Sequence, residues 1–168
     1  MQRSLVGSEM CIRDRLYQYP VIETTYLRQS EEVLDLAAMV KNVTETTNTY
    51  ELQVAIQADC QGSIRIFSDS TGEQALVLSY DTAKGTLQLD RSKTQYPLNP
   101  EFGETRESRI PVNESLKLAL FVDRSTCEIF VNDGKTVLTA NYYPTETQTN
   151  LVLQSTKQNN ATYYVLEK

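Results

Sequence analysis

The side chains of this sequence that could do chemistry are carboxylates. There is no histidine, and histidine is the commonest acid–base catalyst and metal ligand at neutral pH. Asp90, Asp123, Glu128 and Asp133 stand in or beside predicted strand ends. Two carboxyl groups about 5 Å apart can act as a proton donor and a nucleophile. The question for the rest of the sequence is therefore whether the predicted strands could bring two of these carboxyl groups together for catalysis.

The cysteines indicate neither a metal centre nor a redox centre. Cys11, Cys60 and Cys127 are widely spaced and form no Cys-x-x-Cys pair, so the usual zinc and dithiol patterns are missing. Cys127 falls on the apolar phase of its predicted strand, where a buried thiol behaves as a small hydrophobic side chain. The sequence also has no glycine-rich phosphate loop. We therefore predict no metal site and no cofactor, and unpaired thiols favour a reducing compartment.

Length and composition are those of one soluble globular domain. The chain has 168 residues, of which 40% are hydrophobic and 23% charged, and this is enough for a sizeable core. The net charge is −6 and the isoelectric point is near 4.8. An acidic surface repels phosphate backbones, so we expect no nucleic-acid partner. No apolar run approaches the length of about 18 residues that crosses a membrane.

The stretch from Leu116 to Pro144 organises the predicted fold. Leucines and valines alternate with other side chains from Leu116 to Val122, and the alternation resumes from Cys127 to Val131. A period of two places one set on one face of a β-sheet. Asp-Arg-Ser at 123–125 and Asn-Asp-Gly at 132–134 separate the runs with turn-forming residues. The stretch predicts an antiparallel meander of three strands.

Further short alternating runs predict an all-β fold. The clearest runs from Tyr50 to Ala58, and about ten such strands with turn signals between them indicate an antiparallel two-sheet β-sandwich. Ser30 to Val40 reads either as a capped helix or as a strand, and we follow the strand. Tyr96 to Glu107 is polar and predicts an exposed loop. Further runs lie at 64–67, 75–80, 86–90, 150–155 and 162–166.

The central stretch also carries a family resemblance. Phe-Val-Asp-Arg-Ser-x-x-Glu-Ile-Phe-Val-Asn-Asp-Gly, followed by Val-Leu-Thr and Tyr-Pro, resembles the C-terminal β-sandwich signature of the family 32 glycoside hydrolases. Invertases, sucrose-6-phosphate hydrolases, levanases and inulinases belong to that family. Leu-Ser-Tyr-Asp at 78–81 and Leu-Gln-Leu-Asp-Arg-Ser at 87–92 are similar to it too. The resemblance implies a jelly-roll or concanavalin-like sandwich. Its motif residues here are Asp90, Arg91, Ser92, Asp123, Arg124, Ser125, Glu128, Asn132, Asp133 and Gly134.

The resemblance also implies a domain organisation. Residues 30–168 correspond to the sandwich, and residues 16–29 resemble the connector that leaves the catalytic five-bladed propeller, which this chain lacks. Residues 1–15 show no strand alternation and resemble translated adapter sequence. We treat them as a non-native or disordered leader.

The family's catalytic motifs are missing from the sequence. Its nucleophile lies in Trp-Met-Asn-Asp-Pro-Asn-Gly, its stabilising residue in Arg-Asp-Pro and its acid in Glu-Cys-Pro, and none of the three occurs. We therefore assign no catalytic and no substrate-binding residue and expect the chain to be inactive alone. Asp123, Arg124 and Glu128 are interpreted as a structural ion pair with turn capping rather than as sugar contacts, and Asp90 and Arg91 likewise.

Two hypotheses on function follow. The first is a non-catalytic C-terminal module of a β-fructofuranosidase that packs on the catalytic propeller and stabilises it. The alternative is a free-standing fructan-binding sandwich that uses an exposed tyrosine. In the pairs Tyr142–Tyr143 and Tyr163–Tyr164, one ring should be core and the other surface. A homo-oligomer and a fructoside or fructan ligand are further expected partners. The bacterial cytoplasm is the expected compartment, with a secreted parent as the alternative.

Overall fold

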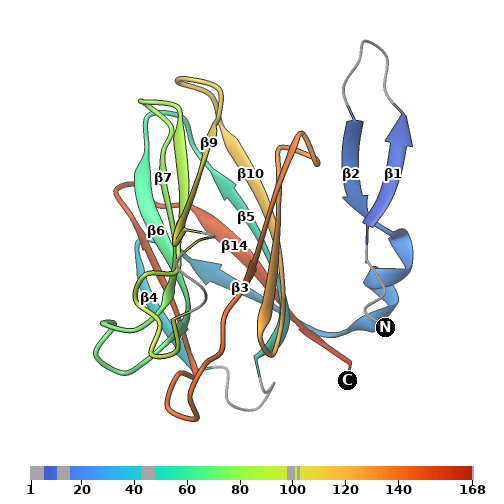
Figure 1. The fold of residues 1–168 in the computed structure, drawn as a ribbon. Helices are drawn as coiled ribbons and strands as arrows, with labels where there is room; N and C mark the ends of the chain where they lie inside the picture. The colour runs from blue at the N-terminus through green and yellow to red at the C-terminus, as the bar shows by residue number, and fades with distance from the viewer. Residues whose placement is uncertain (1–5, 11–15, 43–47, 98–100, 102, 168) are drawn as a thin grey trace.

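The chain folds into two antiparallel six-stranded sheets that pack face to face (Figure 1). The computed structural model describes residues 6–10, 16–42, 48–97, 101 and 103–167. A separate two-stranded sheet and one short 3-10 helix precede the sandwich. The predicted all-β, two-sheet antiparallel sandwich is confirmed. In these ranges, no helix has the length and apolar character to cross a membrane.

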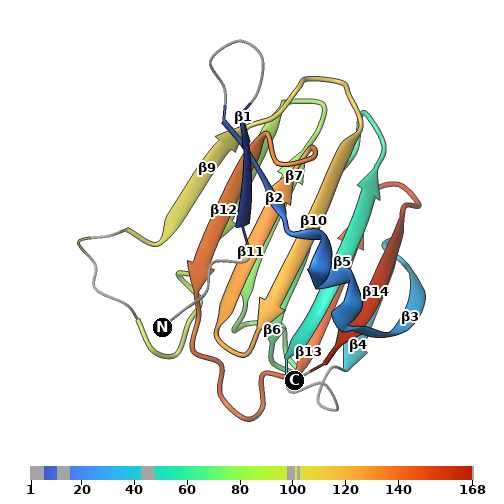
Figure 2. The ribbon, with the colours of Figure 1, turned by 90° about the vertical axis from the view of Figure 1, so that its right-hand side faces the viewer.

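Sheet I contains the predicted meander and is seen face-on in Figure 2. Its strand order is β12-β11-β10-β5-β14-β3. The meander β10-β11-β12 forms as the alternation predicts, with Leu118 of β10 opposite Val131 on one side and Val54 on the other. The strands are β3 (Arg28–Asp35), β5 (Thr49–Ile56), β10 (Leu116–Asp123), β11 (Thr126–Val131), β12 (Thr136–Asn141) and β14 (Asn160–Leu166).

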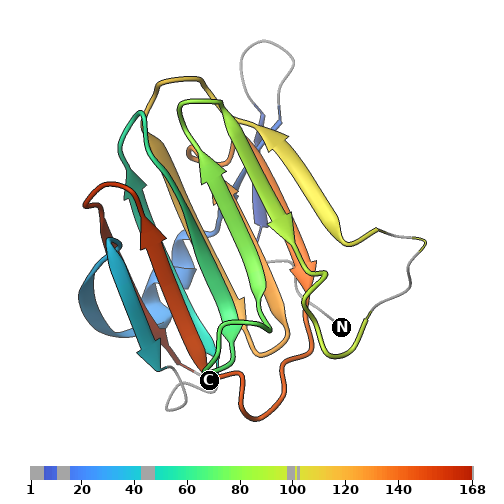
Figure 3. The ribbon, with the colours of Figure 1, turned by 90° about the vertical axis from the view of Figure 1, so that its left-hand side faces the viewer.

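Sheet II forms the opposite layer and is viewed in Figure 3. Its strand order is β4-β13-β6-β7-β8-β9. Four consecutive strands, β6 to β9, are local neighbours, whereas β13 inserts between β4 and β6. The strands are β4 (Ala38–Asn42), β6 (Gln61–Ser68), β7 (Leu76–Asp81), β8 (Thr86–Asp90), β9 (Thr105–Arg109) and β13 (Asn150–Ser155).

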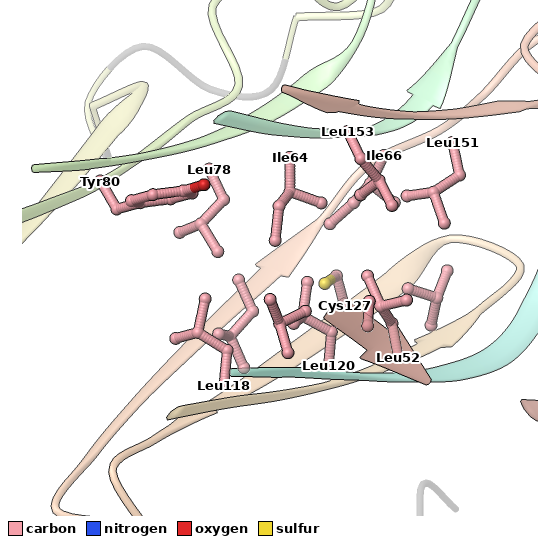
Figure 4. Close-up of a cluster of buried hydrophobic side chains, with 14 of the residues drawn as sticks. Leu52, Ile64, Ile66, Leu78, Tyr80, Leu118, Leu120, Cys127, Leu151 and Leu153 are labelled. Atoms are coloured by element: carbon pink, nitrogen blue, oxygen red, sulfur yellow. The ribbon is translucent and has the colours of Figure 1, made fainter. Parts of the chain in front are cut away.

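The core is the layer of aliphatic side chains between the sheets. Figure 4 shows Leu118 and Leu120 of sheet I facing Ile64 and Leu78 of sheet II. All four side chains are buried, which stabilises each by about 1.5–3 kcal/mol relative to exposure. Cys127 lies in this layer, as its phase predicts.

The tyrosine pairs divide between core and surface as expected. Tyr142 and Tyr163 are buried, whereas Tyr143 is 47% exposed and Tyr164 is half-buried. The ring of Tyr142 stacks on Phe67 with centroids 5.3 Å apart. Tyr142 and Tyr143 directly follow β12, which ends at Asn141, and Tyr143 is the member of its pair that reaches solvent.

The segment ahead of the sandwich is more ordered than the sequence indicates. β1 (Val6–Met10) pairs with β2 (Leu16–Pro20), and η1 (Ile22–Leu27) follows. Residues 6–10 have no alternation, yet backbone hydrogen bonds to β2 are enough to form a strand. The interpretation of residues 1–15 as a non-native leader and the domain boundaries stay predictions. Residues 1–5 and 11–15 lie outside the described residues.

Two further sequence interpretations meet the structure here. The strand alternative for Ser30 to Val40 is confirmed, since β3 and β4 occupy this region. The loop predicted at Tyr96 to Glu107 is wrong at its C-terminal end, because β9 begins at Thr105 and pairs with β8. β9 is an exposed edge strand, so it needs no apolar alternation. Its polar sequence therefore gives no strand signal in the pattern of hydrophobic residues.

Candidate functional site

The outer face of sheet I, which points away from sheet II, carries Glu128 of the predicted motif together with Glu51, which the sequence did not single out. Phe121 of β10 lies opposite Glu51 of β5 and opposite Glu128 of β11. Directly opposed residues share a face, so these three side chains form one row. Phe121, Phe130 and Leu166 make a second, smaller hydrophobic cluster on this face. The two phenylalanine rings meet edge to face at 5.9 Å.

The segments β2 and η1 of the connector (residues 16–29) lie over this outer face (Figure 2). The amide of Gln18 donates a hydrogen bond to the carbonyl oxygen of Gly134 at 3.2 Å. Gly134 has a φ of +78°, and a Cβ atom there would overlap the carbonyl oxygen of Gln18. The glycine of the Asn-Asp-Gly turn is therefore needed twice, once for its left-handed backbone and once for the approach of the connector.

A buried ion pair holds the C-terminal end of the connector on the sheet. Arg28 donates to both carboxylate oxygens of Glu51, at 2.8 and 2.7 Å, and Glu51 is 1% exposed. Gln53 donates to the same carboxylate at 2.8 Å, and the Arg28 guanidinium lies 4.1 Å from the ring centroid of Tyr164. The hydrogen bond to Glu51 raises the pKa of Arg28. Both oxygen atoms of the Glu51 carboxylate therefore accept hydrogen bonds.

Glu128, in the same row, has the opposite environment. Its Oε2 atom is buried and has no hydrogen-bond partner among the residues that the structure describes, and burial raises the pKa of its carboxyl group. A buried acceptor without a donor carries an uncompensated desolvation cost. The Oε2 atom of Glu128 is therefore a buried acceptor that receives no hydrogen bond from the described residues.

The sequence predicted an ion pair among Asp123, Arg124 and Glu128, and this prediction is wrong. In the part of the chain that the structure describes, no salt bridge joins these residues. The register explains why, because Glu128 lies opposite Phe121 and Asp123 lies opposite Thr126. Arg124 sits in the turn between the strands with a left-handed φ of +53°.

The Asp-Arg-Ser corner at 90–92 is a capped turn. The Oδ1 atom of Asp90 accepts a hydrogen bond from the amide of Ser92 at 2.7 Å, the side-chain turn that aspartate favours. Arg91 donates through Nη2 to the carbonyl oxygen of Gly103 at 2.8 Å. The turn capping predicted for Asp90 is confirmed, but the ion pair predicted with Arg91 is wrong, because no salt bridge among the described residues joins the two. Arg91 instead ties two loops together.

The second corner, at 123–125, uses different contacts. The amide of Ser125 donates to the backbone oxygen of Asp123 at 2.6 Å, and the amide of Arg124 donates to the backbone oxygen of Asn48 at 2.9 Å. The carboxylate of Asp123 accepts a weak hydrogen bond from the Thr49 hydroxyl at 3.4 Å. The two corners share a sequence but not a hydrogen-bond pattern.

The hairpin turn at 132–134 extends the pairing of β10. The amide of Asn132 donates to the Lys117 carbonyl oxygen, and the Asn132 side chain accepts from the Lys117 amide, both at 2.9 Å. Asp133 lies 3.7 Å from the Lys117 ammonium, and both side chains are well exposed. Asn132 and Asp133, like Gly134, have a positive φ in the left-handed region. Their role in this structure is to shape the turn that the connector contacts.

A surface pocket at one end of the sandwich is the other candidate site. It has a volume of about 500 Å³ and is lined in part by Asn48, Arg124, Tyr143 and Glu146. The Oδ1 atom of Asn48 is buried without a hydrogen-bond partner in the described part of the chain, while its Nδ2 atom donates to the carbonyl oxygen of Gln148 at 3.3 Å. The pocket thus combines the exposed ring of Tyr143 with amide, guanidinium and carboxylate groups that can form hydrogen bonds.

The two described cysteines lie in different environments. Cys60 and Cys127 are buried free thiols. Burial raises the pKa of Cys60, but hydrogen bonds from Ser155, Thr156 and Asn159 outweigh it and lower the value overall. Burial raises the pKa of Cys127 strongly. Within the ranges described above, no cluster of three or more histidine, cysteine, aspartate or glutamate side chains could hold a metal ion.

Comparison with known proteins decides the family. Residues 20–166 match the family described as "Glycosyl hydrolases family 32 C terminal". The chain belongs to this family. The sequence resemblance at 121–134 is thereby confirmed, and the domain described here is a family 32 C-terminal domain.

Individual relatives are considerably longer than this domain. The chain is 37% identical over 166 residues to the sucrose-6-phosphate hydrolase of Streptococcus mutans serotype c, covering 98% of this chain and 32% of that protein. It is 33% identical to the levanase of Bacillus subtilis, covering 74% of this chain and 20% of the levanase. The solved sucrose-6-phosphate hydrolase of Lactobacillus gasseri superposes with a TM-score of 0.85 at 29% identity, covering 96% of this chain and 33% of that one. The family 32 C-terminal domain thus spans at most about a third of these relatives.

Sequence reasoning missed the contacts that the connector makes. Glu51 stands on the polar phase of its strand, which predicts exposure, and its partner Arg28 lies 23 residues away. The Leu-Arg of the connector, at 27–28, was recognised only as part of the family resemblance. No local pattern in the family 32 C-terminal domain pairs these two residues.

Proposed function

We propose that this domain is the non-catalytic C-terminal module of a β-fructofuranosidase and that it packs on the catalytic propeller and stabilises it. The observation that carries the proposal is the match of residues 20–166 to the family 32 C-terminal domain, in a sequence that contains none of the family's three catalytic motifs. The parent reaction is the hydrolysis of a β-fructofuranosidic bond, of the sucrose or sucrose-6-phosphate type. The relatives named sucrose-6-phosphate hydrolase support that assignment.

A fusion tests this function. The C-terminal third of the Streptococcus mutans enzyme is replaced with residues 16–168, and the fusion is compared with the truncated enzyme and with this chain alone. We expect the fusion to release fructose and to melt as one unit, the truncated enzyme to be less stable, and this chain alone to release none, because glycosidic catalysis needs its two carboxyl groups. Sustained turnover by the isolated chain, or a fusion no more stable than the truncated enzyme, contradicts the proposal.

The second candidate function is a free-standing fructan-binding module, favoured by the pocket beside Tyr143. It predicts retardation in gels that contain inulin or levan. Tyr143→Ala should abolish the retardation, because a stacked aromatic ring supplies much of the binding to a sugar face. Tyr96→Ala is the matched control, since Tyr96 is 55% exposed and lies outside the pocket. Unretarded migration of the folded wild-type chain eliminates this candidate.

Two finer assignments accompany the proposal. We assign the protein to a bacterial cytoplasm, because its described thiols Cys60 and Cys127 are unpaired and unpaired thiols persist in reducing compartments. We also propose that the parent enzyme can form a homo-oligomer through the sandwich. Sedimentation of the fusion at several concentrations measures this directly, and a strictly monomeric fusion refutes it.

A further inference from the structure

The strand β9 lies at one end of sheet II and has a free edge. It pairs with β8 on one side, and none of the described strands pairs with its other side. Figure 3 shows β9 as the outermost strand of this sheet. Its register with β8 runs without a shift, and four of its five residues are exposed. A regular edge without a neighbour is a template for a further strand.

The hydrogen-bonding groups of the β9 backbone alternate between its two edges. At one end of the ladder, the amide of Ile110 donates to the carbonyl oxygen of Gly85 at 3.1 Å. In an antiparallel pair such contacts recur at every second residue, so the even-numbered residues of β9 bond to β8. The amides and carbonyl groups of the odd-numbered residues therefore point to the free edge; these residues are Thr105, Glu107 and Arg109.

The side chains at this edge carry charges of both signs. Ser108 lies opposite the buried Leu87 and so shares the inner face of the sheet, whereas Glu107 and Arg109 project from the outer face. Gln88 donates to Oε1 of Glu107 at 3.2 Å, which holds the carboxylate on that face. None of the ion pairs among the described residues includes Glu107 or Arg109. An acid and a base thus stand two positions apart, each without a counter-charge.

Two copies of β9 can pair about a two-fold axis perpendicular to the sheet. Such an axis keeps every side chain on its own face, so a residue lies opposite its own copy or a residue an even number of positions away. An axis at Ser108 places Glu107 opposite Arg109 of the second copy, and does so twice. An axis at Arg106, Glu107 or Arg109 places like charges opposite each other, which is destabilising. An axis at Thr105 leaves the rest of each strand beyond the end of the other.

The backbone fits the axis at Ser108 as well. Glu107 and Arg109 of the second copy then exchange two backbone hydrogen bonds in each of the two symmetric pairs. Two positions further along, Thr105 faces Pro111 of the second copy, which has no N–H to offer to the Thr105 carbonyl oxygen. That oxygen already accepts a hydrogen bond from Nη1 of Arg106 at 2.9 Å. The carbonyl group that a second copy cannot satisfy is therefore satisfied within its own chain.

We propose that β9 pairs with β9 of a second copy, antiparallel and centred on Ser108, and joins two copies of sheet II into one continuous sheet. The proposal names the surface of the homo-oligomer assigned above and rests on that part of the proposed function. Charges on an edge strand commonly keep other strands away, but here the signs on one copy match those on the other. The contact is small, so the dimer is weak and forms in proportion to concentration.

Charge reversal tests the pairing in this chain. We expect sedimentation velocity to show a monomer–dimer equilibrium for the wild type. Glu107→Arg and Arg109→Glu should each raise the dissociation constant of the dimer at least about tenfold, because each places like charges opposite each other twice. Glu73→Arg is the matched control, since Glu73 is exposed and lies between β6 and β7, outside β9. Melting midpoints equal to that of the wild type establish that the variants are folded.

A mixture of the two variants is the sharpest measurement. The arginines at the edge of Glu107→Arg face the glutamates at the edge of Arg109→Glu, so both opposed positions regain opposite charges. We expect heterodimers by native mass spectrometry in the mixture at concentrations where neither variant dimerises alone. The double variant Glu107→Arg/Arg109→Glu should dimerise like the wild type, whereas an axis at Glu107 would bring two arginines together.

Three results would overturn the proposal. A wild-type chain that stays monomeric at millimolar concentration excludes the dimer, and a dimer that neither single variant weakens uses another surface. Single variants that lose the dimer but do not recover it on mixing exclude the register. None of these measurements depends on catalysis, whereas fructose release and the melt of the Streptococcus mutans fusion test the proposed function. A failure of one is therefore distinguishable from a failure of the other.

Discussion

The ion pair between Arg28 and Glu51 offers the sharpest test of how the connector is held. Arg28→Met keeps the length and most of the apolar stem of the side chain but removes the guanidinium. Glu51, which is 1% exposed, then keeps its negative charge without the partner that neutralises it. We expect a clear loss of stability, because a buried charge is far costlier alone than paired.

The magnitude follows from the contacts. Removing one member of a buried pair costs about 3–5 kcal/mol, and losing the cation–π contact with Tyr164 adds about 0.5–1 kcal/mol. A quarter of the Arg28 side chain is exposed and Gln53 still donates to the carboxylate, so the lower end applies. We expect a loss of about 3 kcal/mol, which lowers the melting midpoint by about 6–12 °C in a domain of this size.

Urea unfolding at pH 7 measures the effect. Lys84→Met is the control, because it removes an ion pair with Asp81 in which the lysine is 76% exposed, and such pairs contribute less than about 1 kcal/mol. The double variant Arg28→Met/Glu51→Met should recover at least half of the loss, since an apolar pair replaces the ionic one. A loss below about 1 kcal/mol for Arg28→Met would refute the reasoning, because the pair would then behave as a surface pair.

Three further perturbations test other parts of the structure. Gly134→Ala should cost about 1–2 kcal/mol for its left-handed backbone and displace the connector, which amide exchange at Gln18 detects as faster exchange. Burial raises the pKa of Glu128, so the stability that its protonated form contributes is present below pH 4.5 and is lost as the pH rises through the raised pKa. In urea titrations from pH 4 to 7, the free energy of unfolding of the wild type should therefore fall relative to that of Glu128→Gln. Parallel curves for the two proteins would contradict this. Gln148 is buried and donates to the Phe67 carbonyl oxygen at 3.0 Å, so Gln148→Leu should cost about 1–3 kcal/mol in the same unfolding assay, and an unchanged midpoint would exclude the bond.

The inner faces of the sheets could be predicted from the sequence. Leu118, Leu120 and Val122 alternate cleanly, and alternation is decisive when one face is buried, because a shift by one residue would expose every leucine. The turn residues at 123–125 and 132–134 have chemistry that is independent of tertiary context. These local rules were sufficient for the meander and for the two-sheet architecture.

The outer face of sheet I could not be predicted in the same way. Alternation tells which residues share a face but not whether another segment covers that face. Glu51 and Glu128 therefore looked like two ordinary polar positions, whereas one is paired with the connector and the other is an orphan acceptor. The expected ion pair with Arg124 failed for a related reason, because nearness in sequence around a turn is not nearness in the cross-strand register.

The position of the last two strands bears on how the protein is made. β13 lies between β4 and β6, and β14 lies between β3 and β5, so both sheets need residues 150–166 in their interiors. A nascent chain that ends before Asn150 would leave β3 and β4 without their sheet neighbours and turn β5 and β6 into open edges, which are templates for aggregation. The ribosome must therefore release nearly the whole chain before either sheet can close. A premature stop codon that removes about a tenth of the residues should cost the entire fold.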